Sequence, residues 1–288
     1  MEIIGIIEAN NSLGEGPVWS VEEQALYWVD IDNDLFQRWD LNTKEITNWK
    51  LPATIGSFAF RKSGGFVLAL RSGLAFFSPE TGYTQLISNP ISNPSRIRFN
   101  DGKCDRYGRF WVGTMDEEFN DPLGSLYCLD INSECRIMKE GIGISNGLGW
   151  SPDNSQFYYT DSSRRSIWAY DYNINTGGIT NERIFVETAN NDIPDGLTID
   201  SDGYVWSAKW DGWKIVRYSP QGNIDKRFSL PVQRPTSCTF GGSKLELLFV
   251  TTAKIDLSVS SLEEQPNAGN IFIIKTDCKG LPEPKFAG

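Results

Sequence analysis

The chain has 288 residues, a net charge of −10 and no histidine. It is long enough to bury a large core, either in one big β domain or in two smaller ones. Lys and Arg form no block, which argues against non-specific binding to nucleic acid or to an anionic membrane. The absence of histidine excludes a Ser-His-Asp or Cys-His catalytic site and a His-ligated zinc or iron centre.

The five cysteines are an odd number and include no CxxC pair, so we expect reduced thiols in a cytoplasmic protein. The first residues lack the basic start and the apolar length of a signal peptide. No run approaches the ~20 apolar residues of a membrane helix. Any metal must then be held by oxygen ligands, which favours Ca²⁺, Mg²⁺ or Mn²⁺ without forbidding Zn²⁺.

Six similar units, each a turn followed by an apolar strand, follow one another along the chain. In the first unit, Glu15 to Trp19 leads into Ala25 to Asp30, and in the third, Asp101 to Asp105 leads into Gly108 to Gly113. The aligned position, which we call the pivot, recurs at a spacing of roughly 41 to 49 residues. The six pivots are Glu15, Gly56, Asp101, Asn146, Asp195 and Thr236.

This spacing is typical of propeller blades with four strands each. No stretch holds a helical apolar period for three turns, so we expect almost no helix. The strand Ile3 to Ile7 would complete the last blade beside Gly269 to Ile274 and close the ring. We therefore predict an all-β, six-bladed β-propeller with four antiparallel strands per blade, as a single domain over residues 1–288. Residues 254–268 read as a surface insertion, and a seven-bladed ring is the alternative.

The innermost strand of each propeller blade starts at one mouth of the central channel, so the pivots should converge in space. Glu15, Asp101 and Asp195 would then face one another with Asn146. Crowded carboxylates raise each other's pKa unless a cation lies among them. The alternative is that each pivot caps its own turn. Because four oxygen-bearing pivots share one ring, we favour a cation site.

Just before the third pivot, Arg98 and Asn100 share one face of an extended segment while Phe99 takes the other. Together with its surroundings, this segment also supports a resemblance. The ordered set of residues 14–19, 98–103, 113–115, 145–148 and 194–197 resembles the SMP-30/gluconolactonase/LRE family. That family includes regucalcin-type and sugar-acid lactonases and the luciferin-regenerating enzymes. The resemblance runs through all six units.

The resemblance implies a six-bladed propeller with one divalent cation, Ca²⁺ before Zn²⁺, Mn²⁺ or Mg²⁺. By motif position, the implied metal ligands are Glu15, Asn146 and Asp195, and the implied substrate-binding residues are Arg98, Asn100 and Glu118. For Glu118 and its acidic neighbours, the alternative is a solvated loop.

The function we predict is metal-dependent hydrolysis of a sugar-acid (aldono-) lactone such as a gluconolactone, with the small sugar lactone as the partner molecule. The resemblance makes Asp195 the general base, but a carboxylate bonded to a dication is a poor base. Asp101, at an equivalent pivot, is therefore a second catalytic candidate. Two alternatives stay open: a non-catalytic Ca²⁺-binding regulatory propeller, and an esterase or phosphotriesterase using the same cation. The pair Arg98 and Asn100 favours catalysis, since a structural ion needs no substrate contacts. The oligomeric state, monomer or weak dimer, stays open.

Overall fold

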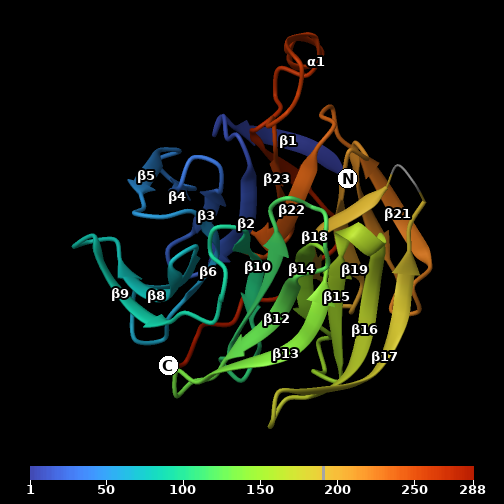
Figure 1. Cartoon of the computed structure of the whole chain (residues 1–288). Coiled ribbons are helices and arrows are strands. Elements are labelled where there is room, and N and C mark those ends of the chain that lie inside the picture. The colour runs from blue at the N-terminus through green and yellow to red at the C-terminus, as the bar shows by residue number, and fades with distance from the viewer. Residues whose placement is uncertain (190–191) are drawn as a thin grey trace.

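The computed structural model describes residues 1–189 and 192–288. Its strands form six four-stranded sheets, and neighbouring strands within each sheet run antiparallel. The sheets stand around a common centre like the blades of a propeller (Figure 1). The predicted six-bladed β-propeller is thus confirmed.

Five blades follow the chain in order from the inner strand outward. Blade one has β2 (Gly14–Ser20), β3 (Ala25–Asp30), β4 (Leu35–Asp40) and β5 (Ile46–Lys50). Blade two has β6 (Ile55–Phe60), β7 (Phe66–Leu70), β8 (Gly73–Ser78) and β9 (Tyr83–Ser88). Blade three has β10 (Ile97–Cys104), β11 (Phe110–Asp116), β12 (Gly124–Leu129) and β13 (Cys135–Ile142). Blade four has β14 (Ser145–Trp150), β15 (Gln156–Asp161), β16 (Ser166–Asn173) and β17 (Gly178–Glu187). Blade five has β18 (Ile193–Ile199), β19 (Val205–Trp210), β20 (Lys214–Tyr218) and β21 (Ile224–Ser229).

Blade six combines both ends of the chain. It contains β22 (Pro235–Gly241), β23 (Leu247–Thr252), β24 (Ile271–Lys275) and, as its outer strand, β1 (Glu2–Ile7). Strand β1 runs antiparallel to β24, with Ile7 opposite Ile271 and Glu2 opposite Lys275. The predicted closure by the N-terminal strand is therefore confirmed.

The core lies between the blades rather than inside one sheet. Strands β3 and β7 are buried along their whole length, whereas the outer strands β5 and β21 are partly exposed. Between blades one and two, the ring of Phe36 lies 4.8 Å from both Phe58 and Phe66, in edge-to-face contacts that aromatic pairs favour. The second strands β3 and β7 are covered on both faces by neighbouring strands and blades, which explains their nearly continuous apolar sequences.

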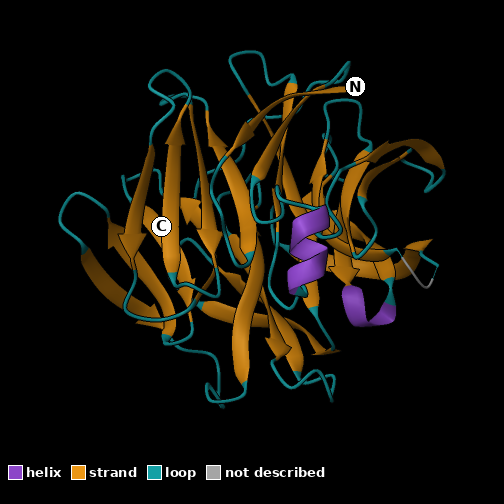
Figure 2. Ribbon diagram, turned by 90° about the horizontal axis from the view of Figure 1, so that it is seen from above, coloured by secondary structure: helices purple, strands orange, loops and turns teal. Residues whose placement is uncertain are grey.

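Helix is nearly absent, as predicted. Among the described residues, the only helical segments are the 3₁₀ turn η1 (Ser162–Arg164) and the single short helix α1 (Val259–Glu264) (Figure 2). Helix α1 belongs to the insertion 254–268, has no buried residue and stands clear of the ring in Figure 1. No helix within the described ranges is long and apolar enough to cross a membrane. All five cysteines are unpaired.

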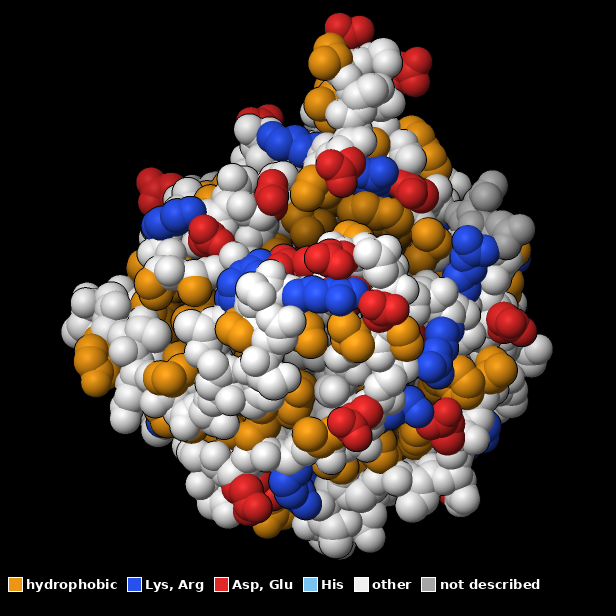
Figure 3. Space-filling view, viewed as in Figure 1, with side chains coloured by type: hydrophobic (Ala, Val, Ile, Leu, Met, Phe, Trp, Pro, Cys, Tyr) orange, Lys and Arg blue, Asp and Glu red, His pale blue; other side chains and the backbone are white. Residues whose placement is uncertain are grey.

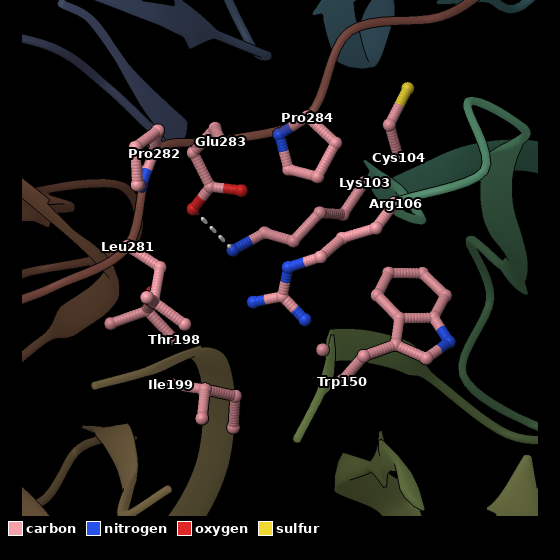
Figure 4. Close-up of a pocket in the computed structure, with 11 residues that line it drawn as sticks. Lys103, Cys104, Arg106, Trp150, Thr198, Ile199, Leu281, Pro282, Glu283 and Pro284 are labelled. Atoms are coloured by element: carbon pink, nitrogen blue, oxygen red, sulfur yellow. Dashed lines mark hydrogen bonds and ion pairs between the residues drawn. The ribbon is translucent and has the colours of Figure 1, made fainter. Parts of the chain in front are cut away.

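The C-terminal segment crosses the ring at the ends of the inner strands. There it borders a cavity of about 30 Å³, room for about one water molecule. In this cavity Lys103 Nζ lies 2.9 Å from Glu283 Oε1 (Figure 4). Further on, the backbone N–H of Phe286 donates to the carbonyl of Phe60 at 2.7 Å, and the Phe286 side chain is fully buried. This segment covers the mouth of the channel opposite the pivots.

Candidate active site

Every inner strand carries an irregularity at its pivot. The register with the second strand shifts between Glu15 and Val18 in β2, and between Pro194 and Leu197 in β18. Strands β6, β10, β14 and β22 shift at the equivalent place. A bulge re-aims side chains and bends the strand. Six bulges at one level therefore present the pivots together, although the residues are far apart in sequence.

Glycine follows several pivots because neighbouring blades come very close there. A Cβ on Gly147 would lie 2.3 Å from the backbone nitrogen of Leu197 in the next blade. A Cβ on Gly196 would lie 2.1 Å from Ser237 Oγ. Only glycine lets the backbones approach this closely. The recurring pairs of a polar pivot and a glycine thus reflect blade-to-blade packing beside the channel.

Three of the six pivots, Glu15, Asn146 and Asp195, border a cavity of about 590 Å³ at the open mouth of the channel. In the space-filling view, acidic and basic side chains surround a hollow with apolar side chains inside it (Figure 3). Five of the predicted site residues line this cavity: Glu15, Arg98, Asn100, Asn146 and Asp195. Asp101 is buried as well, but it is not among the residues that line the cavity.

The three acidic pivots are electrostatically linked. Burial raises the pKa of Glu15, and the charges of Asp195 and Asp101 raise it further. Burial, followed by the charge of Asp101, raises the pKa of Asp195. Burial also raises the pKa of Asp101 to about 6, although Lys103 and Arg98 oppose this. A nearby cation would reverse the shift, since it stabilises the ionised carboxylates.

The donor atoms suit a hard cation. The Oδ1 atom of Asp195 is buried and has no hydrogen-bond partner, which is unusual for a buried carboxylate oxygen and leaves it free to bind a ligand. Across residues 1–189 and 192–288, no three Asp, Glu, Cys or His side chains gather as a cation site. The amide oxygen of Asn146 would therefore have to complete a set with Glu15 and Asp195. Two carboxylates and an amide oxygen are ligands that Ca²⁺ and Mg²⁺ accept.

A chain of hydrogen bonds joins the predicted substrate contacts to the predicted metal ligands. Arg98 Nη1 donates to Asn100 Oδ1 at 2.6 Å. Asn100 Nδ2 in turn donates to Asn146 Oδ1 at 2.7 Å and to the carbonyl of Ser145 at 2.7 Å. These contacts fix the amide of Asn100, with its oxygen toward Arg98 and its nitrogen toward blade four.

Ser162 is a cavity residue that the sequence did not reveal. Asn146 Nδ2 donates to Ser162 Oγ at 2.8 Å, and the Ser162 hydroxyl donates to the carbonyl of Pro194 at 2.5 Å. Ser162 belongs to η1, after the second strand of its blade. It therefore lies outside the repeated position that identified the pivots, and no motif surrounds it.

The acidic loop after β11 differs from the expectation. Glu118, predicted to bind substrate, does not line the cavity: its side chain is 60% exposed and lies 3.4 Å from Arg96. The preceding residue, Glu117, lines the cavity instead and receives two hydrogen bonds from Arg71, both of 2.6 Å. The cause is Arg96, which binds both carboxylate oxygens of Asp116 at 2.8 Å and holds Glu118 on the outer side. The solvated-loop interpretation therefore fits the position of Glu118.

The chain is similar to several known proteins along most of its length. A family model described as "SMP-30/Gluconolactonase/LRE-like region" matches residues 13–254. Regucalcin of Oryctolagus cuniculus is 37% identical over 98% of this chain and 97% of its own length. The 6-deoxy-6-sulfogluconolactonase of Pseudomonas putida is 33% identical over 98% of both chains. The crystal structure of a calcium-binding protein, regucalcin, from Agrobacterium tumefaciens superposes with a TM-score of 0.94 at 25% identity, covering 99% of this chain and 97% of that one.

Proposed function

Because the chain belongs to the SMP-30/gluconolactonase/LRE-like family, we propose that it hydrolyses the lactone of a sugar acid, such as a gluconolactone, with one divalent cation. The observation that carries this proposal is that one cavity holds oxygen donors for a cation beside the pair Arg98 and Asn100. The name of the P. putida relative supports a sugar-acid lactone as substrate. The description of the A. tumefaciens protein as calcium-binding supports Ca²⁺ as the first cation to test.

The cation would be held by Glu15, Asn146 and Asp195, whose oxygens are hard ligands. When bound, it would supply Lewis acidity, which polarises a carbonyl and makes water easier to ionise. It would also remove the cost of keeping carboxylates ionised in a buried ring.

Arg98 and Asn100 would bind and orient the lactone. Arg98 carries five N–H donors. Its Nη1 donates to Asn100 Oδ1 and to the carbonyl of Phe99, and its Nε lies 3.5 Å from Glu117 Oε1. The donors on Nη2 would therefore meet substrate hydroxyl or carbonyl oxygens. Because hydrogen bonds hold both ends of the Asn100 amide, its side chain would meet the lactone in a fixed orientation. This lowers the entropic cost of positioning the substrate.

Asp195 would accept the proton of the attacking water. Water oxygen adds to the lactone carbonyl carbon, the ring C–O bond breaks, and the released ring oxygen takes up a proton, so that a hydroxy acid is formed. Asp101 remains the second candidate for the proton-transfer role. Of these two carboxylates only Asp195 lines the cavity, which favours Asp195 for this role.

The decisive experiment follows acid release from a panel of five- and six-membered aldonolactones with a pH indicator, with and without EDTA. We expect hydrolysis that EDTA abolishes and that Ca²⁺, Zn²⁺, Mn²⁺ or Mg²⁺ restores. Glu15→Gln should lower both bound metal and turnover, whereas Glu182→Gln, on the outer strand β17, should change neither. Calcium binding without hydrolysis of any lactone would favour the non-catalytic Ca²⁺-binding alternative. EDTA-resistant hydrolysis would contradict the role of the cation.

A further inference from the structure

The carboxylate of Glu117 lies between two guanidinium groups of the cavity. Arg71 Nη1 and Nη2 each lie 2.6 Å from one oxygen of Glu117, the two-pronged geometry in which Arg–carboxylate pairs are strongest. Arg98 Nε lies 3.5 Å from Glu117 Oε1. All three side chains line the cavity. An anion-binding pair of arginines is thus already occupied by a carboxylate of the protein itself.

The backbone around Glu117 holds this carboxylate in place. Its N–H donates to the carbonyl of Arg96 at 2.9 Å, and the guanidinium of Arg96 grips the neighbouring Asp116. On the other side, Arg71 Nη1 also donates to the carbonyl of Pro94 at 3.1 Å. Arg71 and Glu117 are therefore both held in position before any substrate binds.

The charged group lies on only part of the cavity wall. The remainder of the wall is largely apolar, with Ile193, Trp210 and Ile255, but it also carries the carboxylates of Asp32 and Asp256. A substrate whose carbonyl lies at the pivots and whose far end reaches toward blades two and three would meet the Arg71–Glu117 pair. Hydroxyl groups suit that pair, because each can donate to the carboxylate or accept from a guanidinium. An anionic group at the far end of the substrate would have to displace the Glu117 carboxylate from the two arginines and would be repelled by it.

We propose that Glu117 sets the charge preference of the site: it favours lactones with an uncharged polyhydroxyl end and disfavours those with an anionic group at that end. This inference rests on the proposed lactonase function. Without the Glu117 charge, the guanidinium groups of Arg71 and Arg98 would be available to bind an anionic group of the substrate. Charged groups held in this way typically contribute more than a neutral hydrogen bond.

The test compares Glu117→Gln with the wild type on two substrates, a neutral aldonolactone and an aldarolactone that carries a free carboxylate. We expect the ratio of kcat/KM for the anionic over the neutral lactone to rise about tenfold or more, a size typical of a charge-assisted hydrogen bond. Glu118→Gln removes the same charge one residue away on the outer side, and should leave the ratio unchanged. In the double variant Arg71→Gln/Glu117→Gln, the increase in the ratio of kcat/KM for the anionic over the neutral lactone should disappear.

Binding of the open-chain products separates this inference from the proposed function. Titration calorimetry with an aldonate and an aldarate, at one fixed Ca²⁺ concentration, should show the same shift of preference toward the more anionic compound in Glu117→Gln without any turnover. If no lactone is hydrolysed but the preference shifts, the lactonase proposal fails and the role of Glu117 stands. An unchanged preference in folded Glu117→Gln, or an equal change in Glu118→Gln, would overturn the role of Glu117.

Discussion

The hydroxyl of Ser162 accepts a hydrogen bond of 2.8 Å from the amide nitrogen of Asn146. The same hydroxyl donates to the carbonyl of Pro194, the residue just before Asp195. Ser162 thus ties the pivot of blade four to the strand that carries the pivot of blade five. It also determines which way the Asn146 amide points, because only the nitrogen of that amide can donate to it. We infer that Ser162 positions the amide of Asn146, one of the proposed cation ligands.

We expect Ser162→Ala to weaken Ca²⁺ binding by roughly 10-fold or more, the effect usually seen when a group that orients a metal ligand is removed. Isothermal calorimetry on the metal-free protein measures this directly, without a substrate. Ser163→Ala is the matched control, because the Ser163 hydroxyl bonds Asp161 and not Asn146. Equal Ca²⁺ affinity of Ser162→Ala and the wild type would refute the positioning role.

Cation binding should depend on pH. The raised pKa values of Glu15 and Asp195, and that of Asp101 at about 6, mean that protons occupy these carboxylates in the metal-free protein at acid pH. A cation must displace those protons, so its affinity should fall as the pH drops. Calcium titrations between pH 5 and 8 test this, together with the proton release in weakly buffered solution. Constant affinity over that range would contradict the electrostatic linkage of the pivots.

The stability of the metal-free protein should show the matching effect. Folded pKa values above the unfolded ones stabilise the fold below the unfolded pKa, and this stabilisation is lost as the pH rises through the folded pKa. Without a cation, the free energy of unfolding should therefore fall as the pH rises above about 4, and the part due to Asp101 is lost as the pH rises through about 6. The free energies of unfolding measured with urea in EDTA and in excess Ca²⁺ should differ increasingly as the pH rises. Parallel pH profiles would speak against a cation among the carboxylates.

The choice of general base is testable with two conservative substitutions. We expect Asp195→Asn to lose both bound metal and most of the lactonase turnover, because Asp195 would serve as ligand and base. Asp101→Asn should keep its metal, since Asp101 is not a proposed ligand. Metal content by mass spectrometry and kcat on one aldonolactone measure both effects. If Asp101→Asn keeps its metal but loses turnover, the proton-transfer role passes to Asp101; normal turnover excludes Asp101 from it.

Lys209 gives the fold a pH dependence of the opposite sign. Its side chain is fully buried, its Nζ donates to Ser207 Oγ at 2.9 Å, and burial lowers its pKa to about 7. Between this value and the usual pKa of lysine, the unfolded chain binds a proton that the folded chain does not. Its contribution to stability is therefore complete above the unfolded pKa and is lost as the pH falls through about 7.

Replacing this lysine should remove that dependence. Between pH 7 and 8.5 the free energy of unfolding of the wild type should rise by about 1 to 2 kcal/mol relative to Lys209→Met. Lys275→Met, at an exposed position of β24, should keep the slope of the wild type. Urea unfolding at several pH values, with EDTA present throughout, gives the comparison. The prediction fails if wild type and Lys209→Met have the same slope.

The repeat made the pivots predictable and left other site residues out of reach. Glu15, Asn146 and Asp195 occupy one repeated position, and the propeller's symmetry brings that position to one place. Glu117 and Glu118 lie in a loop that the other blades do not repeat. Which of them faces the cavity depends on Arg96, whose position relative to Asp116 follows only from strand pairing. A six-residue helix such as α1 is likewise too short to show an apolar period.

The pairing of β1 with β24 has a consequence for how the protein is made. Asn10 and Asn270, at the edge of this pairing, are 260 positions apart and are joined by a hydrogen bond of 2.9 Å. At a synthesis rate of about 5 to 20 residues per second, β1 waits on the order of ten seconds or more for β24 to be made. Until then blade six lacks its outer strand, and β1 remains an unpaired apolar segment. Synthesis of β24, rather than growth of the early blades, is therefore the event that allows the ring to close.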